Sequence, residues 1–170
     1  TPTSGDYILS GINTSKMDDD EMAGIRSTKI GFVFQSFHLI PRLTAFENIE
    51  MPMILSGMNP KERSEKVNSA LEKVGLTDRS DHKPEQLSGG QRQRVAIARS
   101  IVMEPDVLLA DEPTGNLDTT SGKEVVKLIE ELNIAGLTLI VVTHDREMGG
   151  RSNRLIELRD GKIINDQRKA

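Results

Sequence analysis

Two adjacent carboxylates, Asp111 and Glu112, come directly after the apolar run 107–110. Placing charged side chains at the end of a buried strand costs free energy unless an opposite charge pairs with them. A hard cation is the simplest such partner. In ATPases that transfer phosphoryl groups, one carboxylate at this place holds Mg²⁺ and a neighbour orients or deprotonates the attacking water. The pair therefore predicts Asp111 as a metal ligand and Glu112 as a catalytic residue. Taken alone, the tripeptide 111–113 is more typical of a turn after a strand.

A second candidate is the segment 87–91, in which Ser88, Gly89, Gly90 and Gln91 open a helix. Glycine has no side chain to keep a ligand away, and a helix start presents free N–H groups and the positive end of the helix dipole. We expect this segment to suit the γ-phosphate of a nucleotide. The alternative is an ordinary serine-capped helix with glycines in its entry turn.

Two further polar residues come after apolar strands. His144 follows the run 139–142, where its imidazole could bond a phosphate oxygen or respond to its loss on hydrolysis. Gln35 follows the run Ile30–Phe34, where a neutral amide can ligate Mg²⁺ and its water shell. Either residue alone is more often an ordinary turn residue, so their meaning depends on what surrounds them.

The pattern of apolar residues predicts the elements that must position these groups. The run 107–110 is apolar at consecutive positions, which is typical of a parallel strand covered on both faces. Helices of period 3.6 alternate with such strands, and Pro52 is expected to kink or end one of them. The expected strands are 7–9, 30–34, 107–110 and 139–142, with a hairpin about Asp160–Gly161, and the expected helices are 15–26 capped by Ser15, 44–55, 60–74 opened by Asn59, 88–104 and 121–133.

Composition narrows the class of protein. The 170 residues suit one domain, and the net charge of −4 comes from 22 basic and 26 acidic residues scattered along the chain, so nucleic acid is not an expected partner. The chain has no cysteine, which excludes disulfides and thiol nucleophiles and suits a reducing compartment such as the cytoplasm. No apolar run approaches the roughly 20 residues of a membrane-spanning helix, so a partner would have to supply any membrane segment.

These motifs occur together in an order and spacing that resembles the ATP-binding subunits of ATP-binding cassette (ABC) transporters. Gln35 resembles the family's Q-loop, 87–91 its signature motif, 107–112 its Walker B strand with catalytic glutamate, 116–118 its D-loop and His144 its switch histidine. The amino-acid sequence of residues 32–41, 43–49 and 110–118 is similar to that of the lipoprotein-releasing and macrolide-export branch of the family.

The resemblance implies an α/β fold: a layered, mostly parallel sheet of the P-loop NTPase type with an inserted helical subdomain. Residues 1–35 and 104–170 would form the ATPase core and residues 36–103 the helical subdomain. It implies ATP and Mg²⁺ as ligands, with Asp111 and Gln35 at the metal and Glu112, His144 and Gln35 at the reaction centre.

The family resemblance also implies partners. Two subunits would form a head-to-tail dimer that sandwiches two ATP molecules, with the signature residues 88–91 and Asp118 binding ATP across the interface. The helical subdomain would dock on a transmembrane permease at the cytoplasmic face of the membrane, with Gln35 as its hinge to the core.

One family motif is missing. A phosphate loop reads G-x-x-x-x-G-K-[ST], and the Gly-Lys pairs at 122–123 and 161–162 lack both the earlier glycine and the following Ser or Thr. The interpretation is a chain truncated before Thr1, without its first strands and its Walker A loop and unable to hydrolyse ATP as it stands. Loss of a strand beside 107–110 would also expose apolar surface and favour aggregation.

Two other functions remain open. A soluble ABC ATPase of DNA repair, chromosome structure or translation would share the motifs, but the short stretch between Gln35 and Leu87 has no sustained heptads of the kind that repair and chromosome types insert. A fragment that only docks on a permease, or supplies its signature motif to an intact partner, is the second alternative. The transported substance is not determined by these residues.

Overall fold

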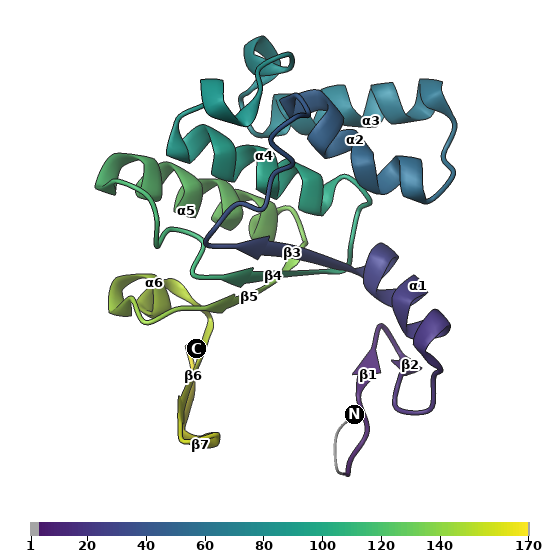
Figure 1. Cartoon of the computed structure of the whole chain (residues 1–170). Coiled ribbons are helices and arrows are strands. Elements are labelled where there is room, and N and C mark those ends of the chain that lie inside the picture. The colour runs from purple at the N-terminus through teal and green to yellow at the C-terminus, as the bar shows by residue number, and fades with distance from the viewer. Residues whose placement is uncertain (1–3, 170) are drawn as a thin grey trace.

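The computed structural model describes residues 4–169, and its centre is a three-stranded parallel sheet (Figure 1). The strands are β3 (Ile30–Phe34), β4 (Val107–Asp111) and β5 (Thr138–Val142), with β4 in the middle. Phe34 is paired with Asp111, and Asp111 with Val142, so all three carboxyl ends meet at one edge. The predicted α/β class with parallel strands is confirmed.

Helices cover one face of this sheet in two layers (Figure 1). In the inner layer, α4 (Gly89–Ile101) contacts β3 and also α5 (Thr119–Ile134), which in turn contacts β5. In the outer layer, α2 (Ala45–Leu55) and α3 (Pro60–Lys73) pack on α4 and on each other, and the 3-10 turns η1 (Thr77–Arg79) and η2 (Pro84–Gln86) lead from α3 to α4. The core runs through all layers, since Leu71, Ile97 and Leu108 are fully buried.

Side-chain caps set the starts of α2, α3 and α4 where the sequence predicts them. Thr44, Asn59 and Ser88 each accept a main-chain N–H that the first helical turn leaves unpaired. Pro52 lies inside α2, which continues to Leu55. The predicted end of the helix at about Leu55 is confirmed, and Pro52 does not end it at its own position.

Two predicted helix starts are also wrong. α1 (Asp19–Lys29) begins behind Asp18, because the Ser15 hydroxyl is used as an acceptor for the main-chain N–H of Tyr7. α5 begins two residues before Ser121, because the Asp118 carboxylate accepts the N–H groups of Thr120 and Ser121, both at 3.0 Å. An aspartate cap close to the first helical turn is favoured by its charge as well as by its hydrogen bonds.

Two hairpins extend from the other side of the sheet (Figure 1). The first joins β1 (Ile8–Leu9) to β2 (Ile12–Asn13), and the second joins β6 (Arg154–Arg159) to β7 (Lys162–Arg168) through the predicted Asp-Gly turn. The short α6 (Arg146–Arg151) leads from the sheet to the second hairpin. Neither β2 nor α6 is predicted by the sequence pattern.

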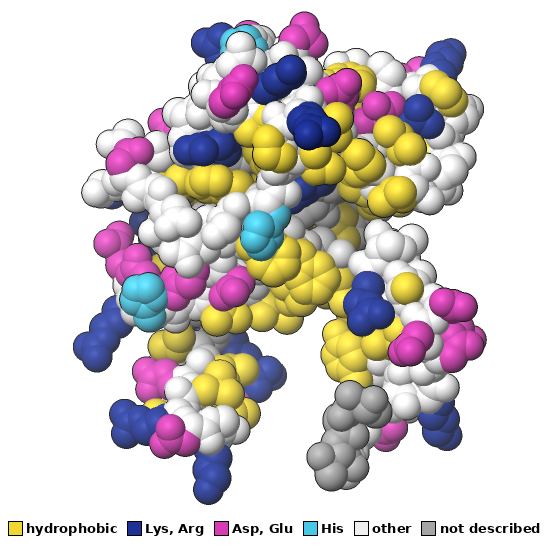
Figure 2. Space-filling model, viewed as in Figure 1, with side chains coloured by type: hydrophobic (Ala, Val, Ile, Leu, Met, Phe, Trp, Pro, Cys, Tyr) yellow, Lys and Arg dark blue, Asp and Glu magenta, His cyan; other side chains and the backbone are white. Residues whose placement is uncertain are grey.

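The sheet face opposite the helices is open among the described residues. Side chains on this face are well exposed, with Phe32 at 41%, Ile140 at 51% and Val142 at 61%. Figure 2 shows hydrophobic side chains gathered there between the two hairpins. The expectation that the strand at 107–110 is covered on both faces is therefore wrong for this part of the chain. The expectation that a strand is missing beside residues 107–110 is also wrong. In the described residues β4 is paired on both edges, and the unpaired edges of the sheet belong to β3 and β5.

In residues 4–169, none of the helices combines the length and the apolar character needed to cross a membrane.

Candidate functional site

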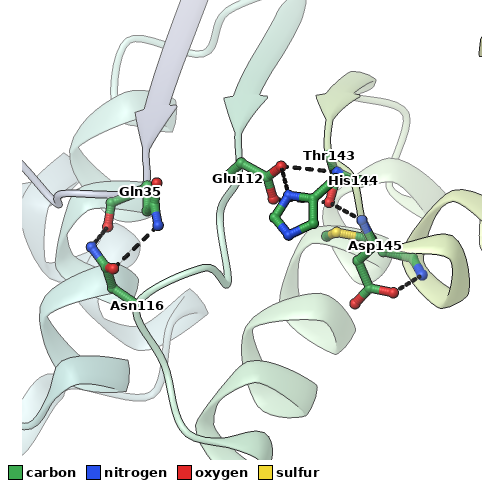
Figure 3. Close-up of polar contacts among 7 residues, drawn as sticks. Gln35, Glu112, Asn116, Thr143, His144 and Asp145 are labelled. Atoms are coloured by element: carbon green, nitrogen blue, oxygen red, sulfur yellow. Dashed lines mark hydrogen bonds and ion pairs between the residues drawn. The ribbon is translucent and has the colours of Figure 1, made fainter.

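The predicted site residues from the sheet lie along its carboxyl edge (Figure 3). Gln35 follows β3, Asp111 ends β4 and is followed by Glu112, and His144 comes two residues after β5. Parallel pairing in register is what brings these segments to the same edge although the sequence separates them by up to 109 residues. Their order along the edge is the strand order β3, β4, β5.

Glu112 is held in place from the neighbouring strand. Its main-chain N–H donates to Val142 O at 2.9 Å, and its φ of 45° turns the chain sharply away from β4. The Thr143 hydroxyl donates to Glu112 Oε2 at 3.0 Å and the His144 N–H to Oε1 at 2.9 Å, while His144 Nδ1 lies 2.5 Å from Oε1. The last contact requires the imidazole proton to be on Nδ1, since the carboxylate can only accept.

These contacts determine the charge of the Glu112 carboxylate. Burial by itself would raise its pKa, and this is the largest single effect. The hydrogen bonds from the His144 ring and N–H and from the Thr143 hydroxyl, together with the charge of His144, outweigh it, so the pKa of Glu112 lies below its ordinary value. The group is ionised at neutral pH and can accept a proton or orient a water molecule.

Asp111 and Gln35 supply oxygen donors of the kind that Mg²⁺ prefers. They stand at the ends of adjacent strands, because Asp111 is paired with Phe34, the residue before Gln35. Residues 4–169 contain no cluster of three or more His, Cys, Asp or Glu side chains able to hold a metal ion. One carboxylate and one amide still fit Mg²⁺, which keeps several waters and is commonly completed by the phosphates of its nucleotide.

The Gln35 amide contacts Asn116, a residue to which the sequence gives no individual role. Gln35 Nε2 donates to Asn116 Oδ1 at 3.2 Å, and Asn116 Nδ2 donates to the Gln35 main-chain carbonyl at 3.1 Å (Figure 3). The pair connects the end of β3 with the segment that follows Glu112.

The first turn of α4 carries the signature residues and is closed on itself. Gln91 N–H donates to Ser88 Oγ at 3.2 Å, and Ser88 N–H donates to Gln91 Oε1 at 2.9 Å, which is a capping box. Gly90 is buried, and a Cβ there would lie 2.9 Å from the Ser121 Cβ, so the glycine allows close contact with α5. A Cβ at Gly89 would lie 3.4 Å from Leu117 Cδ2, in the segment before α5. The ordinary cap and the predicted phosphate site therefore use the same turn.

Asp118 serves as the N-cap of α5 within its own chain. Its hydrogen bonds from the Ser121 N–H and hydroxyl and from the Thr120 N–H hold the pKa of its carboxyl below the ordinary value. The contact of Asp118 with ATP across a dimer stays a prediction.

Two residues of α4 that sequence reasoning missed hold the end of β3 and the segment that follows it. Gln93 is fully buried, and its Nε2 donates to Phe34 O at 3.3 Å and to Pro113 O at 2.7 Å. Arg99 donates to the carbonyls of His38, at 2.7 Å, and Phe37, at 3.1 Å, both of which have positive φ. A polar residue on the apolar side of an otherwise regular helix is the signal that could have identified Gln93.

Comparisons with known proteins agree with this geometry. The family model described as "ABC transporter" matches residues 1–115. Two ABC transporter ATP-binding proteins of Bacillus subtilis that are described as uncharacterized are similar to the chain. YvrO is 51% identical over 98% of the chain and 73% of its own length, and YknY is 53% identical over 96% and 71%.

More distant relatives carry functional names. The macrolide export ATP-binding/permease protein MacB of Rhodopseudomonas palustris is 48% identical over 98% of the chain, which spans 25% of that protein. Among solved structures, the ATP-binding cassette MJ0796, in a dimeric post-hydrolysis state bound to ADP and Pi, superimposes with a TM-score of 0.84 at 44% identity, over 98% of this chain and 74% of that one. The fold is therefore that of an ABC ATPase cassette. The chain belongs to the ABC transporter family, as an ATP-binding domain.

Proposed function

We propose that this chain is the ATP-hydrolysing part of an ABC transporter that powers export or release of a substrate through a membrane permease. The observation that carries the proposal is the ionised Glu112 carboxylate at the end of the central strand, fixed by Thr143 and His144 beside Asp111. Relatives named as export ATP-binding/permease proteins support the direction of transport.

In this mechanism Glu112 accepts a proton from the attacking water or orients it. Thr143 and His144 keep the carboxylate in place and ionised, which a base needs before the reaction begins. Asp111 and the Gln35 amide oxygen would hold Mg²⁺, which when bound neutralises charge on the transferring phosphate. The His144 ring, 90% exposed in its side chain, remains accessible to a phosphate oxygen.

We place the second half of each ATP site on a partner copy. Ser88, Gly89, Gly90 and Gln91, at a helix start, and Asp118, at the start of the next helix, would bind ATP in trans in a head-to-tail dimer. The dimeric state of MJ0796 supports this arrangement.

Residues 1–35 and 104–170 would form the ATPase core, and residues 36–103 the helical subdomain that docks on the permease at the cytoplasmic membrane face. The stretch between Gln35 and Leu87 holds α2, α3 and two short turns, which suits a transporter better than the long coiled coils of repair and chromosome ATPases.

The test compares Mg²⁺-dependent phosphate release by two proteins. One is the 170-residue chain, which contains no G-x-x-x-x-G-K-[ST] motif. The other, called the extended chain below, joins the same residues to the segment that carries the phosphate loop in a relative. We expect hydrolysis by the extended chain alone, and a fall of about 10²- to 10⁴-fold in its Glu112→Gln form.

Either of two results would overturn the proposal. Hydrolysis by the 170-residue chain that depends on Glu112 would show that no phosphate loop is needed. Hydrolysis by the extended chain that survives Glu112→Gln would remove the carboxylate from the mechanism. Glu157→Gln, at an exposed position in β6, is the matched control.

A further inference from the structure

The two hydrogen bonds between Gln35 and Asn116 fix the orientation of both amides. A main-chain carbonyl can only accept, so Asn116 must present its Nδ2 to Gln35 O. This turns Asn116 Oδ1 toward the Gln35 side chain. Because Oδ1 can only accept, Gln35 must donate to it through its Nε2. Rotating either amide by half a turn would set two acceptors or two donors against each other. The Gln35 Oε1 atom is consequently the one left available for another partner.

Gly115 provides the space for this contact. A Cβ atom at position 115 would lie 2.6 Å from Gln35 Nε2 and 2.9 Å from Gln35 Cδ, so the Gln35 side chain rests directly over the Gly115 backbone. Gly115 does not have a positive φ, so a left-handed backbone is not the reason for a glycine at this position. Its hydrogen atom is what lets the Gln35 amide reach Asn116.

Gln93 connects the two chain segments that carry this contact, the end of β3 and the segment after Glu112. It bonds Phe34 O, one residue before Gln35, and Pro113 O, three residues before Asn116. Because Gln93 is fully buried in α4, the strand end and the segment after Glu112 are braced from the helical side as well as joined through their own amides.

We propose that Asn116 is a positioning residue that orients the Gln35 amide, so that Oε1, and not Nε2, is offered to the Mg²⁺ ion of bound nucleotide. This inference rests on the proposed function, in which Gln35 is a ligand of that ion. An exposed glutamine side chain otherwise samples many rotamers and both amide orientations, and an NH₂ group cannot ligate a cation. The contact with Asn116 removes this freedom before the ion binds.

The first experiment measures the Mg²⁺ concentration that half-saturates hydrolysis by the extended chain at saturating ATP. Asn116→Ala removes both hydrogen bonds, and only the bond from Gln35 Nε2 orients the amide. Losing that one neutral hydrogen bond should raise the half-saturating Mg²⁺ concentration about two- to tenfold. Gly115→Ala should act in the same direction, because its Cβ displaces the Gln35 side chain while Asn116 is kept.

Matched controls separate positioning from general damage. Asn133→Ala removes a side-chain hydrogen bond to Leu137 O far along α5, and Gly24→Ala adds a Cβ that meets nothing within 4 Å. Both should leave the half-saturating concentration unchanged. In a Gln35→Ala background, Asn116→Ala should have no further effect, since the residue on which it acts is gone.

A second readout needs neither metal nor activity. The side-chain ¹⁵N–¹H₂ signal of Gln35, assigned by its absence in Gln35→Ala, should shift and lose protection from hydrogen exchange in Asn116→Ala and not in Asn133→Ala. An unchanged Gln35 signal, or equal effects of Asn116→Ala with and without the Gln35 side chain, would overturn the proposal. Failure of the ATPase mechanism itself would show as Glu112-independent hydrolysis, a result that leaves the NMR outcome readable.

Discussion

At the scale of single residues, the site depends on hydrogen bonds that keep a carboxylate ionised and fix the position of a buried amide. The Glu112 side chain is only 21% exposed, yet three donors keep its carboxylate ionised. The buried Gln93 amide has a similar role, because it donates to the main-chain carbonyl of Pro113 after β4 and, together with the Phe37 N–H, to that of Phe34 at the end of β3. Both arrangements give variants with defined expected effects.

The lowered pKa of Glu112 predicts a dependence of stability on pH. A carboxyl whose pKa is depressed by folding stabilises the folded state above its unfolded pKa of about 4.3, and this contribution is lost as the pH falls through the folded pKa. The free energy of unfolding of the wild type should therefore exceed that of Glu112→Gln at pH 7, and the difference should shrink below about pH 4.3. Urea titrations of both proteins at several pH values measure it, and a difference independent of pH would contradict the assignment.

Gln93→Leu tests the buried brace without creating a large cavity. The change leaves Pro113 O without its side-chain donor and Phe34 O with only the Phe37 N–H at 3.4 Å, which should lower the free energy of unfolding by about 1–3 kcal/mol. Urea unfolding is the measurement. Gln167→Leu, at an exposed position in β7, is the control and should change stability little, so equal effects of the two substitutions would show that the brace contributes nothing.

At the scale of elements, the sequence predicts those strands and helix starts that depend on neighbouring residues alone. The strands Ile30–Phe34 and 107–110 follow from consecutive apolar residues, and the helix starts after Asn59 and Ser88 follow from these capping residues. α1 ends at Lys29, three residues beyond the predicted end, for a tertiary reason. Lys29 lies 3.1 Å from the Asp106 carboxylate, and Lys29 O accepts the Asp106 N–H, so a distant residue stabilises the last turn.

Gly31→Ala tests how closely α4 lies against β3. A Cβ at position 31 would be 2.4 Å from the main-chain carbonyl oxygen of Ser100, and a backbone atom cannot move aside as a flexible side chain can. Helix and strand must separate, so the free energy of unfolding should fall by about 1–3 kcal/mol. Gly150→Ala, whose Cβ would meet nothing within 4 Å, is the control in a urea titration. An unchanged Gly31→Ala protein would mean that α4 and β3 are not in this contact.

At the scale of the whole molecule, the sequence predicted which residues stand at strand ends but not how they are held. Asp111, Glu112 and His144 could be placed because parallel strands end at one edge. The Gln35–Asn116 contact joins residues 81 apart, and the Gln93 bond to Phe34 joins residues 59 apart. No short-range pattern encodes such pairs, because they exist only once α4, β3 and β4 have packed together.

The open face of the sheet predicts the behaviour of the 170-residue chain in solution. Phe32, Ile140 and Val142 are 41%, 51% and 61% exposed on one surface, and contiguous apolar patches of this kind promote association. We expect the apparent mass by light scattering to rise with protein concentration and the chain to bind the dye ANS. The double variant Phe32→Thr and Ile140→Thr should reduce both. Ile134→Thr, which removes a more exposed but isolated isoleucine at 85%, should reduce neither. A monodisperse wild-type chain with a cooperative melt would show that this face does not drive association, whereas a fall in association with Ile134→Thr alone would place the contact at the end of α5.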